Sequence, residues 1–116
     1  MQKKIALVAF NGEMMCFVHV LLNALDMHSK GFDVKVIIEG SAAKLISALS
    51  NNAAPFFPVY SEVREKGLID CVCFACASKM GSLEDTKAQG LQLSDEMSGH
   101  PSLARHIEQG YEVISF

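Results

Sequence analysis

The chain has 116 residues, of which half are apolar and a fifth are charged, and its formal net charge is −3 at pH 7. This length and composition are typical of a single globular domain over residues 1–116, and no apolar run reaches the roughly 18 residues that a membrane-spanning helix needs. The lysines and arginines are scattered without a basic stripe, which argues against nucleic acid as a partner.

The chain reads as an alternation of strand-like and helix-like segments. The opening apolar run is shorter than the core of an export signal and has strand character, so a cytoplasmic protein without structural disulfides is expected. In chain order the expected elements are a strand over 3–10, a helix over 13–30, a strand over 32–39, a short helix over 42–49 capped by Ser41, a short helix over 59–66, a strand over 68–74, a helix from Ala77 or Ser82 to Gln89, a strand near 91–93, a helix opened by Ser98–Pro101 and a strand over 111–116.

Four glycines support this alternation. Gly31, Gly67, Gly90 and Gly110 each follow a helix-like stretch and precede an apolar, strand-like run. Glycine accepts the left-handed backbone that closes a helix, so it is common just past a helix C-terminus. Five strands joined by helical crossovers predict a mainly parallel sheet with helices on both faces, and they direct attention to the carboxyl ends of the strands.

One connection, over residues 50–58, is expected to be irregular because it contains two asparagines and two prolines. Phe56 and Phe57 lie in it, and their rings need cover either from the core of the chain itself or from a neighbouring subunit.

Three cysteines gather in the segment Cys71-x-Cys73-x-x-Cys76. Alternation along a strand puts Cys71 and Cys73 on the same side, with Cys73 at the carboxyl end and Cys76 in the turn before the next helix. Amides of that helix, together with Lys79, would lower a thiol pKa, whereas burial among apolar side chains would raise it. The residues alone leave this balance open.

Three kinds of chemistry fit the Cys73 and Cys76 thiols. One thiol could hold a sulfane sulfur as a persulfide and pass it on, or the pair could form a dithiol–disulfide couple without the tryptophan-containing flanks of thioredoxin-like proteins. Zinc binding by the cysteines and a histidine is the weakest of the three, because a second paired motif is missing from the sequence. No metal or cofactor is therefore expected. Cys71 and Cys16 are interpreted as small core residues.

At these residues the chain resembles the DsrE-like sulfur-relay family, which includes the DsrE, DsrF, TusD, TusC and YchN-like proteins. The resemblance is carried by the opening strand, turn and long helix, by Cys73 with Gly81 eight residues later, and by the closing GYEVISF. It implies a three-layer α/β/α fold with a five-stranded parallel sheet, assembly into trimers or hexamers, and a cysteine that passes persulfide sulfur to a partner carrier protein. Cys76 is an additional thiol beside the matched one.

Other side chains are expected near this site. The wall of a substrate pocket is predicted to include Asn11, Gly12, Glu13, Met14, Lys79 and His100. His100 precedes Pro101 near a strand end, where it could donate a proton to a thiolate or simply cap or pack. His106 and His28 are interpreted as residues on helix surfaces.

The leading hypothesis is a small sulfur-handling protein, either a sulfurtransferase or a sulfur carrier. Cys73 is the expected sulfur acceptor and Cys76 the second thiol. The rival hypotheses are a non-catalytic oligomeric binding module with a pocket at the strand ends and a dithiol redox protein.

Overall fold

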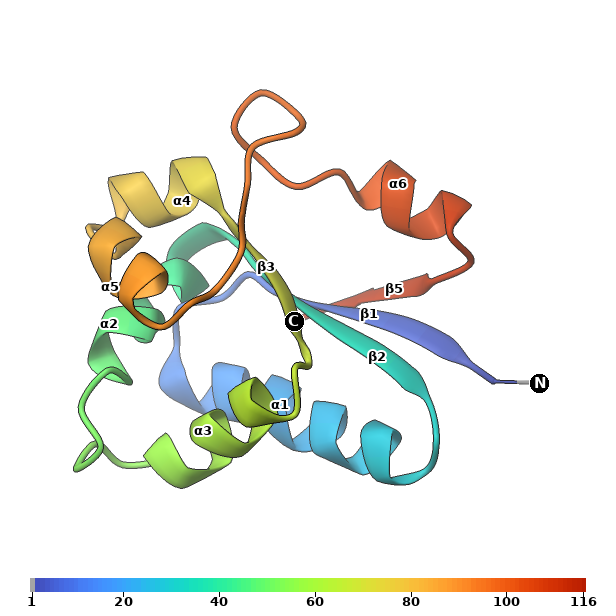
Figure 1. Ribbon diagram of the computed structural model, residues 1–116, viewed down its shortest axis with the longest axis horizontal. Coiled ribbons are helices and arrows are strands. Elements are labelled where there is room, and N and C mark those ends of the chain that lie inside the picture. The colour runs from blue at the N-terminus through green and yellow to red at the C-terminus, as the bar shows by residue number, and fades with distance from the viewer. Residues whose placement is uncertain (1) are drawn as a thin grey trace.

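The computed structural model describes residues 2–116, which form a three-layer α/β/α fold around a five-stranded parallel sheet (Figure 1). The strands are β1 (Lys4–Ala9), β2 (Asp33–Ile38), β3 (Ile69–Cys73), β4 (Leu93–Ser94) and β5 (Glu112–Ser115). Their order across the sheet is β4-β3-β2-β1-β5, and every neighbouring pair is parallel. The expected fold class is thereby confirmed.

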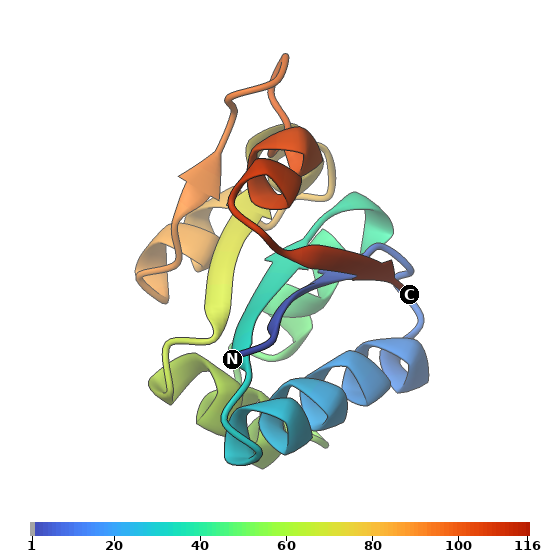
Figure 2. The same ribbon diagram turned by 90° about the vertical axis from the view of Figure 1, so that its right-hand side faces the viewer.

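The helices cover the two faces of the sheet unequally. They are α1 (Met14–Ser29), the 3-10 helix η1 (Gly40–Lys44), α2 (Leu45–Ala48), α3 (Phe57–Glu65), α4 (Phe74–Lys79), α5 (Leu83–Ala88) and α6 (Leu103–Glu108). The long helix α1 and helix α3 lie on one side of the sheet, whereas α6 lies on the other (Figures 1 and 2). None of the helices within residues 2–116 is long and apolar enough to cross a bilayer.

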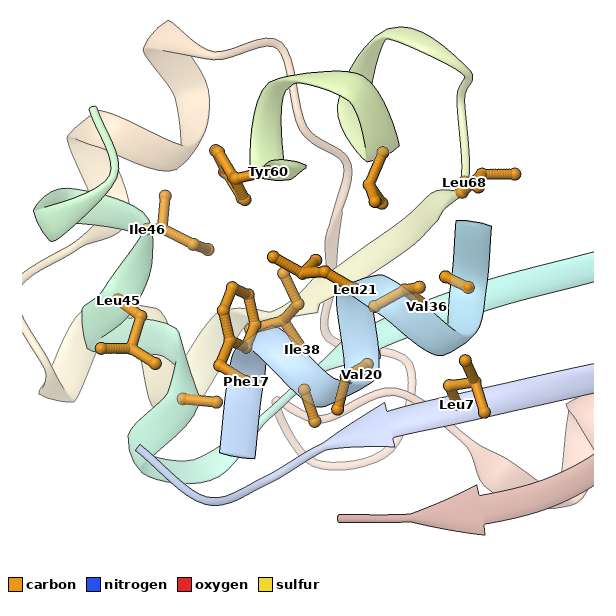
Figure 3. Packing of buried hydrophobic residues seen from close by; sticks show 14 of the residues in the cluster. Leu7, Phe17, Val20, Leu21, Val36, Ile38, Leu45, Ile46, Tyr60 and Leu68 are labelled. Carbon is orange, nitrogen blue, oxygen red and sulfur yellow. The ribbon is translucent and has the colours of Figure 1, made fainter. Parts of the chain in front are cut away.

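The main core lies between the sheet and α1, with α2, α3 and α5 closing its sides. Its largest fully buried side chains include Phe17 and Leu21 of α1, Ile38 of β2 and Tyr60 of α3, which converge in Figure 3. The alternating side chains of the strands explain this arrangement, because every second residue of a strand points to the same face. The ring of Phe56 remains outside this core and is 39% exposed.

The opposite face carries a smaller apolar cluster. Ala6, Val8, Ile37 and Cys71 project from three adjacent strands and are covered by Leu103 of α6 together with the ring of Tyr111. Cys71 therefore packs on one face of β3 while its neighbour Val72 belongs to the main core on the other. This is the alternation that the strand pattern predicted.

The helix boundaries confirm the glycine pattern and correct three details. Gly31, Gly67, Gly90 and Gly110 all have positive φ values, between 71° and 94°, just past a helix. The segment expected as one helix ending at Gln89 is two helices, because Gly81 (φ 75°) interrupts it.

The other two details concern where helices begin. The short helix expected over residues 42–49 is the 3-10 helix η1 followed by α2, and Glu39 rather than Ser41 is at its N-cap. Helix α6 starts at Leu103 with Ser102 as N-cap, so Ser98–Pro101 precede it as a separate turn.

The chain changes sides of the sheet after β4. After β3 it enters α4 and α5, which contribute Ala77 and Leu83 to the main core, and after β4 it enters α6 on the opposite face. Two neighbouring parallel strands whose following segments diverge leave a crevice at their carboxyl ends, which is where α/β proteins place their ligand sites.

Candidate functional site

Two thiols lie where β3 becomes α4. Cys73 is the last residue of β3 and the N-cap of α4, and its Sγ accepts a hydrogen bond from the amide of Cys76 at 3.4 Å. The helix begins directly at Phe74, so Cys76 lies in its first turn and not in a preceding loop as expected. All four cysteines of the chain are free thiols.

A tight hairpin turn after β4 supplies an imidazole. Met97 and His100 exchange backbone hydrogen bonds of 2.8 and 3.0 Å across the turn. Ser98 (φ 49°) and Gly99 (φ 92°) between them both have left-handed backbones, which is the pattern of a type I′ turn. The sequence pattern predicts a helix start at these residues, and the structure has a hairpin turn there instead.

This turn is fixed on both sides. The carbonyl of Gly99 accepts a hydrogen bond of 2.9 Å from the amide of Ala75 in α4. On the other side, the Glu96 carboxylate accepts hydrogen bonds from the Arg105 guanidinium (2.8 Å to Nε) and from the Ser102 amide (3.1 Å). These hydrogen bonds lower the pKa of Glu96 to about 2. The position of His100 is therefore determined by contacts to both α4 and α6.

The turn brings His100 against the thiols. Its Nδ1 lies 3.0 Å from the Sγ of Cys73, which is also 3.6 Å from the Gly99 carbonyl oxygen. The Sγ atoms of Cys73 and Cys76 and a ring nitrogen of His100 all lie within 4.8 Å of one another. Cys73 is 0% exposed, whereas Cys76 and His100 are half-buried. The buried thiol therefore lies beside two side chains that are each partly exposed to solvent.

Burial dominates the ionisation of the inner thiol. It is the largest of the effects that together raise the pKa of Cys73 to about 12; the neighbouring Cys76 thiol acts in the same direction, and the hydrogen bond from the Cys76 amide opposes it. Burial, assisted by the charge of Asp70, also raises the pKa of Cys71 to about 12. The balance that the sequence left open is thus decided by desolvation, so the resting Cys73 is a thiol.

An acidic side chain that was not among the predicted site residues lies near Cys73. Glu39 follows β2 at the carboxyl edge of the sheet, and only 9% of it is exposed. Burial raises the pKa of Glu39, and the charges of His100 and His106 partly counteract this effect. The signal was present in the sequence, since an acidic residue directly after a fully apolar strand end is a candidate site residue.

Glu39 lines a groove of about 540 Å³ at this edge of the sheet. The other lining side chains are mostly apolar and include Phe10, Leu103 and Phe116, with Asn11 at the rim. Phe10 is 56% exposed. The structure therefore brings Asn11 to a groove beside Glu39.

The remaining residues of the predicted pocket wall have local structural contacts. Gly12 donates its amide to the Ser41 hydroxyl at 2.8 Å, and a Cβ at this position would lie only 2.6 Å from the Ser41 carbonyl oxygen. Glu13 caps α1 by accepting the Cys16 amide at 3.1 Å, and Met14 packs against the main core.

Lys79 is exposed at the C-terminal end of α4, opposite the end that holds the thiols. Among the residues predicted for the pocket wall, His100 is the one that the structure joins directly to Cys73.

His106 corrects an expectation. The sequence pattern predicts a helix-surface residue, but His106 is 0% exposed and its ring packs from α6 against β3. Its Nε2 is 2.9 Å from the carboxylate of Asp70 and its Nδ1 is 2.9 Å from the carbonyl of Ser102. Periodicity could not reveal this, because α6 has only six residues and the apolar stripe of so short a helix is poorly defined.

Comparison with known proteins agrees with the fold. A sequence model of the DsrE/DsrF-like family matches residues 6–116. An uncharacterized protein of Methanocaldococcus jannaschii, MJ0733, is 33% identical over 96 residues, which cover 83% of this chain and 76% of that protein.

Two shorter similarities are to uncharacterized proteins of Archaeoglobus fulgidus. One is 51% identical over 37 residues, covering 32% of this chain and all of that protein, and the other is 40% identical over 42 residues, covering 36% and 69%. No solved structure gives a significant match. Because the family match extends over nearly the whole chain, this protein belongs to the DsrE/DsrF-like family.

Proposed function

We propose that this protein handles sulfane sulfur, which it accepts as a cysteine persulfide at the Cys73–Cys76 site and passes to the thiol of a carrier protein. The observation that carries the proposal is the meeting of two free thiols and an imidazole at the carboxyl end of β3. Membership of the DsrE/DsrF-like family supports it. Catalysis and carriage of sulfur are both compatible with this arrangement.

Exposure favours Cys76 as the thiol that first receives sulfur. Cys73 was the expected acceptor, but its Sγ is fully buried and its pKa is about 12, whereas Cys76 is half-buried on the solvent side. The reactive form of cysteine is the thiolate, which needs both ionisation and access to the donor. Cys73 then has the role of the second thiol.

The transfer conserves atoms and electrons. The Cys76 thiolate attacks the outer sulfur of a donor persulfide, so a new S–S bond forms while the donor S–S bond breaks and leaves the donor as a thiolate. A thiolate of the carrier protein then attacks the outer sulfur on Cys76, and the Cys76 thiolate is released. Both steps are thiol exchanges without a net oxidant.

Cys73 and His100 offer a second outcome for the loaded site. His100 can accept the Cys73 proton across the 3.0 Å contact, because an imidazole nitrogen is a suitable base for a thiol. The Cys73 thiolate can then attack Cys76 Sγ, which forms a Cys73–Cys76 disulfide and expels hydrosulfide. In the absence of a carrier thiol, this step discharges the site.

The test is incubation of the reduced, metal-free protein with a small persulfide donor under anaerobic conditions, followed by intact and site-mapped mass spectrometry. The wild type is expected to gain the mass of one sulfur atom on Cys76 or Cys73. Cys76→Ser should lose most of the adduct, whereas Cys16→Ser and Cys71→Ser serve as matched controls that keep it. An unchanged mass of the fully reduced wild type would refute the proposal.

Two rival functions keep a specific observation in their favour. The short distance between the Cys73 and Cys76 sulfurs is also that of a dithiol redox pair, which would show a measurable disulfide potential and reduction by thioredoxin. The apolar groove beside Glu39 suits a binding module whose thiols are passive. Ordinary, slow alkylation of both thiols would favour the binding module.

We also propose that the chain is a cytoplasmic homo-oligomer, with trimers or hexamers suggested by the family. Exposed apolar side chains support association, among them Phe10, Ile107 and Ile114 near the α6 face and the β5 edge. Light scattering coupled to size-exclusion chromatography tests the oligomeric state, and a monomer at micromolar concentration would contradict it.

A further inference from the structure

The Cys73, Cys76 and His100 side chains offer three ligand atoms of the kind that soft and borderline metal ions prefer. Two come from the start of α4 and the third from the hairpin turn after β4, and all three atoms lie within 4.8 Å of one another. We propose that they form a binding site for one Zn²⁺ ion per chain. The sequence has no second paired motif that would indicate zinc, but the fold supplies the third ligand from a distant segment.

The distances suit a tetrahedral ion. With zinc bonds of about 2.0 to 2.3 Å, neighbouring ligand atoms of a tetrahedral site lie about 3.4 to 3.8 Å apart. The Cys73 Sγ–His100 Nδ1 distance of 3.0 Å and the 4.8 Å limit of the group bracket these values. The three side chains would therefore need to move by less than about 1 Å to bind the ion. Two of them, Cys76 and His100, are half-buried and have room to do so.

The charges also match. Two thiolates and a neutral imidazole compensate the double charge of Zn²⁺, so the loaded site is neutral in a region where Cys73 is removed from water.

Three protein ligands leave one tetrahedral position for an exogenous ligand. Sites with three ligands and an open position are typical of reactive zinc, whereas structural zinc is closed by four. Cys76 and His100 are half-buried, so an exogenous ligand has access to this side of the site. Zinc would also hold both thiols, so it is expected to compete with sulfur at Cys76. The zinc proposal does not depend on the proposed sulfur function.

The first experiment titrates reduced, metal-free protein anaerobically with Co²⁺, a spectroscopic probe, and then displaces the probe with Zn²⁺. The expected result is one metal per chain, thiolate-to-cobalt charge-transfer bands, the visible bands of a tetrahedral ion, and release of roughly two protons on zinc binding. Cys73→Ser, Cys76→Ser and His100→Ala should each weaken zinc binding by roughly 100-fold or more.

Cys16→Ser and Cys71→Ser are the matched controls, since they remove thiols outside the cluster, and both should bind zinc as the wild type does. The proposal is overturned if the reduced wild type shows no tetrahedral cobalt bands, or if those bands persist in both Cys73→Ser and Cys76→Ser. Far-ultraviolet circular dichroism shows whether each variant is folded.

A second measurement requires no variant. Zinc should slow the alkylation of Cys76 in the wild type by at least about tenfold and leave Cys16 unchanged. Equal alkylation rates with and without zinc would contradict the site even if a variant failed to fold. Persulfide loading is measured on metal-free protein, so the two proposals are tested separately. If the protein binds zinc but takes up no persulfide sulfur, only the sulfur function is refuted. If it takes up sulfur but binds no zinc, only the metal site is refuted.

Discussion

His100 and His106 are six positions apart, and both contact a side chain of β3, yet their surroundings are opposite. His106 is fully buried, and both of its ring nitrogens face oxygen acceptors, one from Asp70 and one from Ser102. His100 is half-buried and places one ring nitrogen against the sulfur of Cys73. A ring with two occupied nitrogens holds α6 on the sheet, whereas a partly exposed ring beside a thiol remains available for chemistry.

The largest expected effect is a loss of stability when the contact between His106 and Asp70 is removed. His106→Ala should lower the free energy of unfolding by about 3 kcal/mol, because it leaves the Asp70 carboxylate without its partner and opens a cavity under α6. Urea unfolding measures this loss. His28→Ala, at an exposed position of α1, is the matched control and should change stability by less than about 0.5 kcal/mol. If His100→Ala lost as much unfolding free energy as His106→Ala, the two histidines would not differ in their structural roles.

Removing the charge of Asp70 is expected to lower the free energy of unfolding by somewhat less than His106→Ala does. Burial of Asp70 opposes its ionisation, but the hydrogen bond from His106 and the charge of Lys35, whose Nζ lies 3.6 Å away, outweigh burial and lower the pKa of this carboxyl. Asp70→Asn should therefore lose about 2 kcal/mol of unfolding free energy at pH 7.

The lowered pKa also predicts the direction of the pH dependence. The stability contributed by Asp70 is complete above the unfolded value of about 4 and is lost as the pH falls through the lower folded pKa. Unfolding curves of the wild type and Asp70→Asn should therefore converge toward low pH. Glu96 adds a separate acid-sensitive contribution that both proteins share. A constant difference between the two proteins down to acid pH would exclude this account of Asp70.

The partly exposed site around His100 predicts a difference in reactivity between the Cys73 and Cys76 thiols. Cys76 should be alkylated at least about tenfold faster than Cys73, because Cys73 is inaccessible to the reagent until α4 or the hairpin turn moves. Site-mapped mass spectrometry after short exposure to iodoacetamide measures both rates in the same sample. Faster modification of Cys73 would return it to the role of first acceptor.

A smaller effect is expected from the turn that positions His100. Gly99→Ala should destabilise the protein by about 1 kcal/mol, because φ is 92° and the new Cβ would lie 3.2 Å from Ala75. It should also change the alkylation rate of Cys76. Gly90→Ala is the matched control, since it has φ 74° and open space around it, and it should cost stability without altering the thiols.

The smallest expected effect is at Glu39. Burial raises its pKa, so its contribution to stability is complete below the unfolded value of about 4 and is lost as the pH rises through the folded pKa. Glu39→Gln should therefore be more stable than the wild type at pH 7, by less than about 1 kcal/mol, and equally stable near pH 4. A less stable Gln variant at pH 7 would show that the carboxylate has a favourable partner.

Much of the site was beyond prediction because its members are distant in sequence. The position of Cys73 at a strand end followed from local alternation, and so did the opposite orientations of Cys71 and Val72. The contact between Cys73 and His100 joins residues 27 positions apart, and it depends on the type I′ turn, which was interpreted as a helix start. Whether Cys73 ionises depends on its burial, a property of the whole packed chain.

The sequence by itself determined the alternation of strands and helices and the glycines that end four of the helices, because side-chain periodicity and left-handed backbones are local requirements. It also determined that thiols stand at the end of β3. Only the tertiary structure decided the strand order, the unequal cover of the two sheet faces, and the burial of His106 beside the partial exposure of His100. These features arise from long-range packing, in which segments remote along the chain exclude water from one group and leave another accessible.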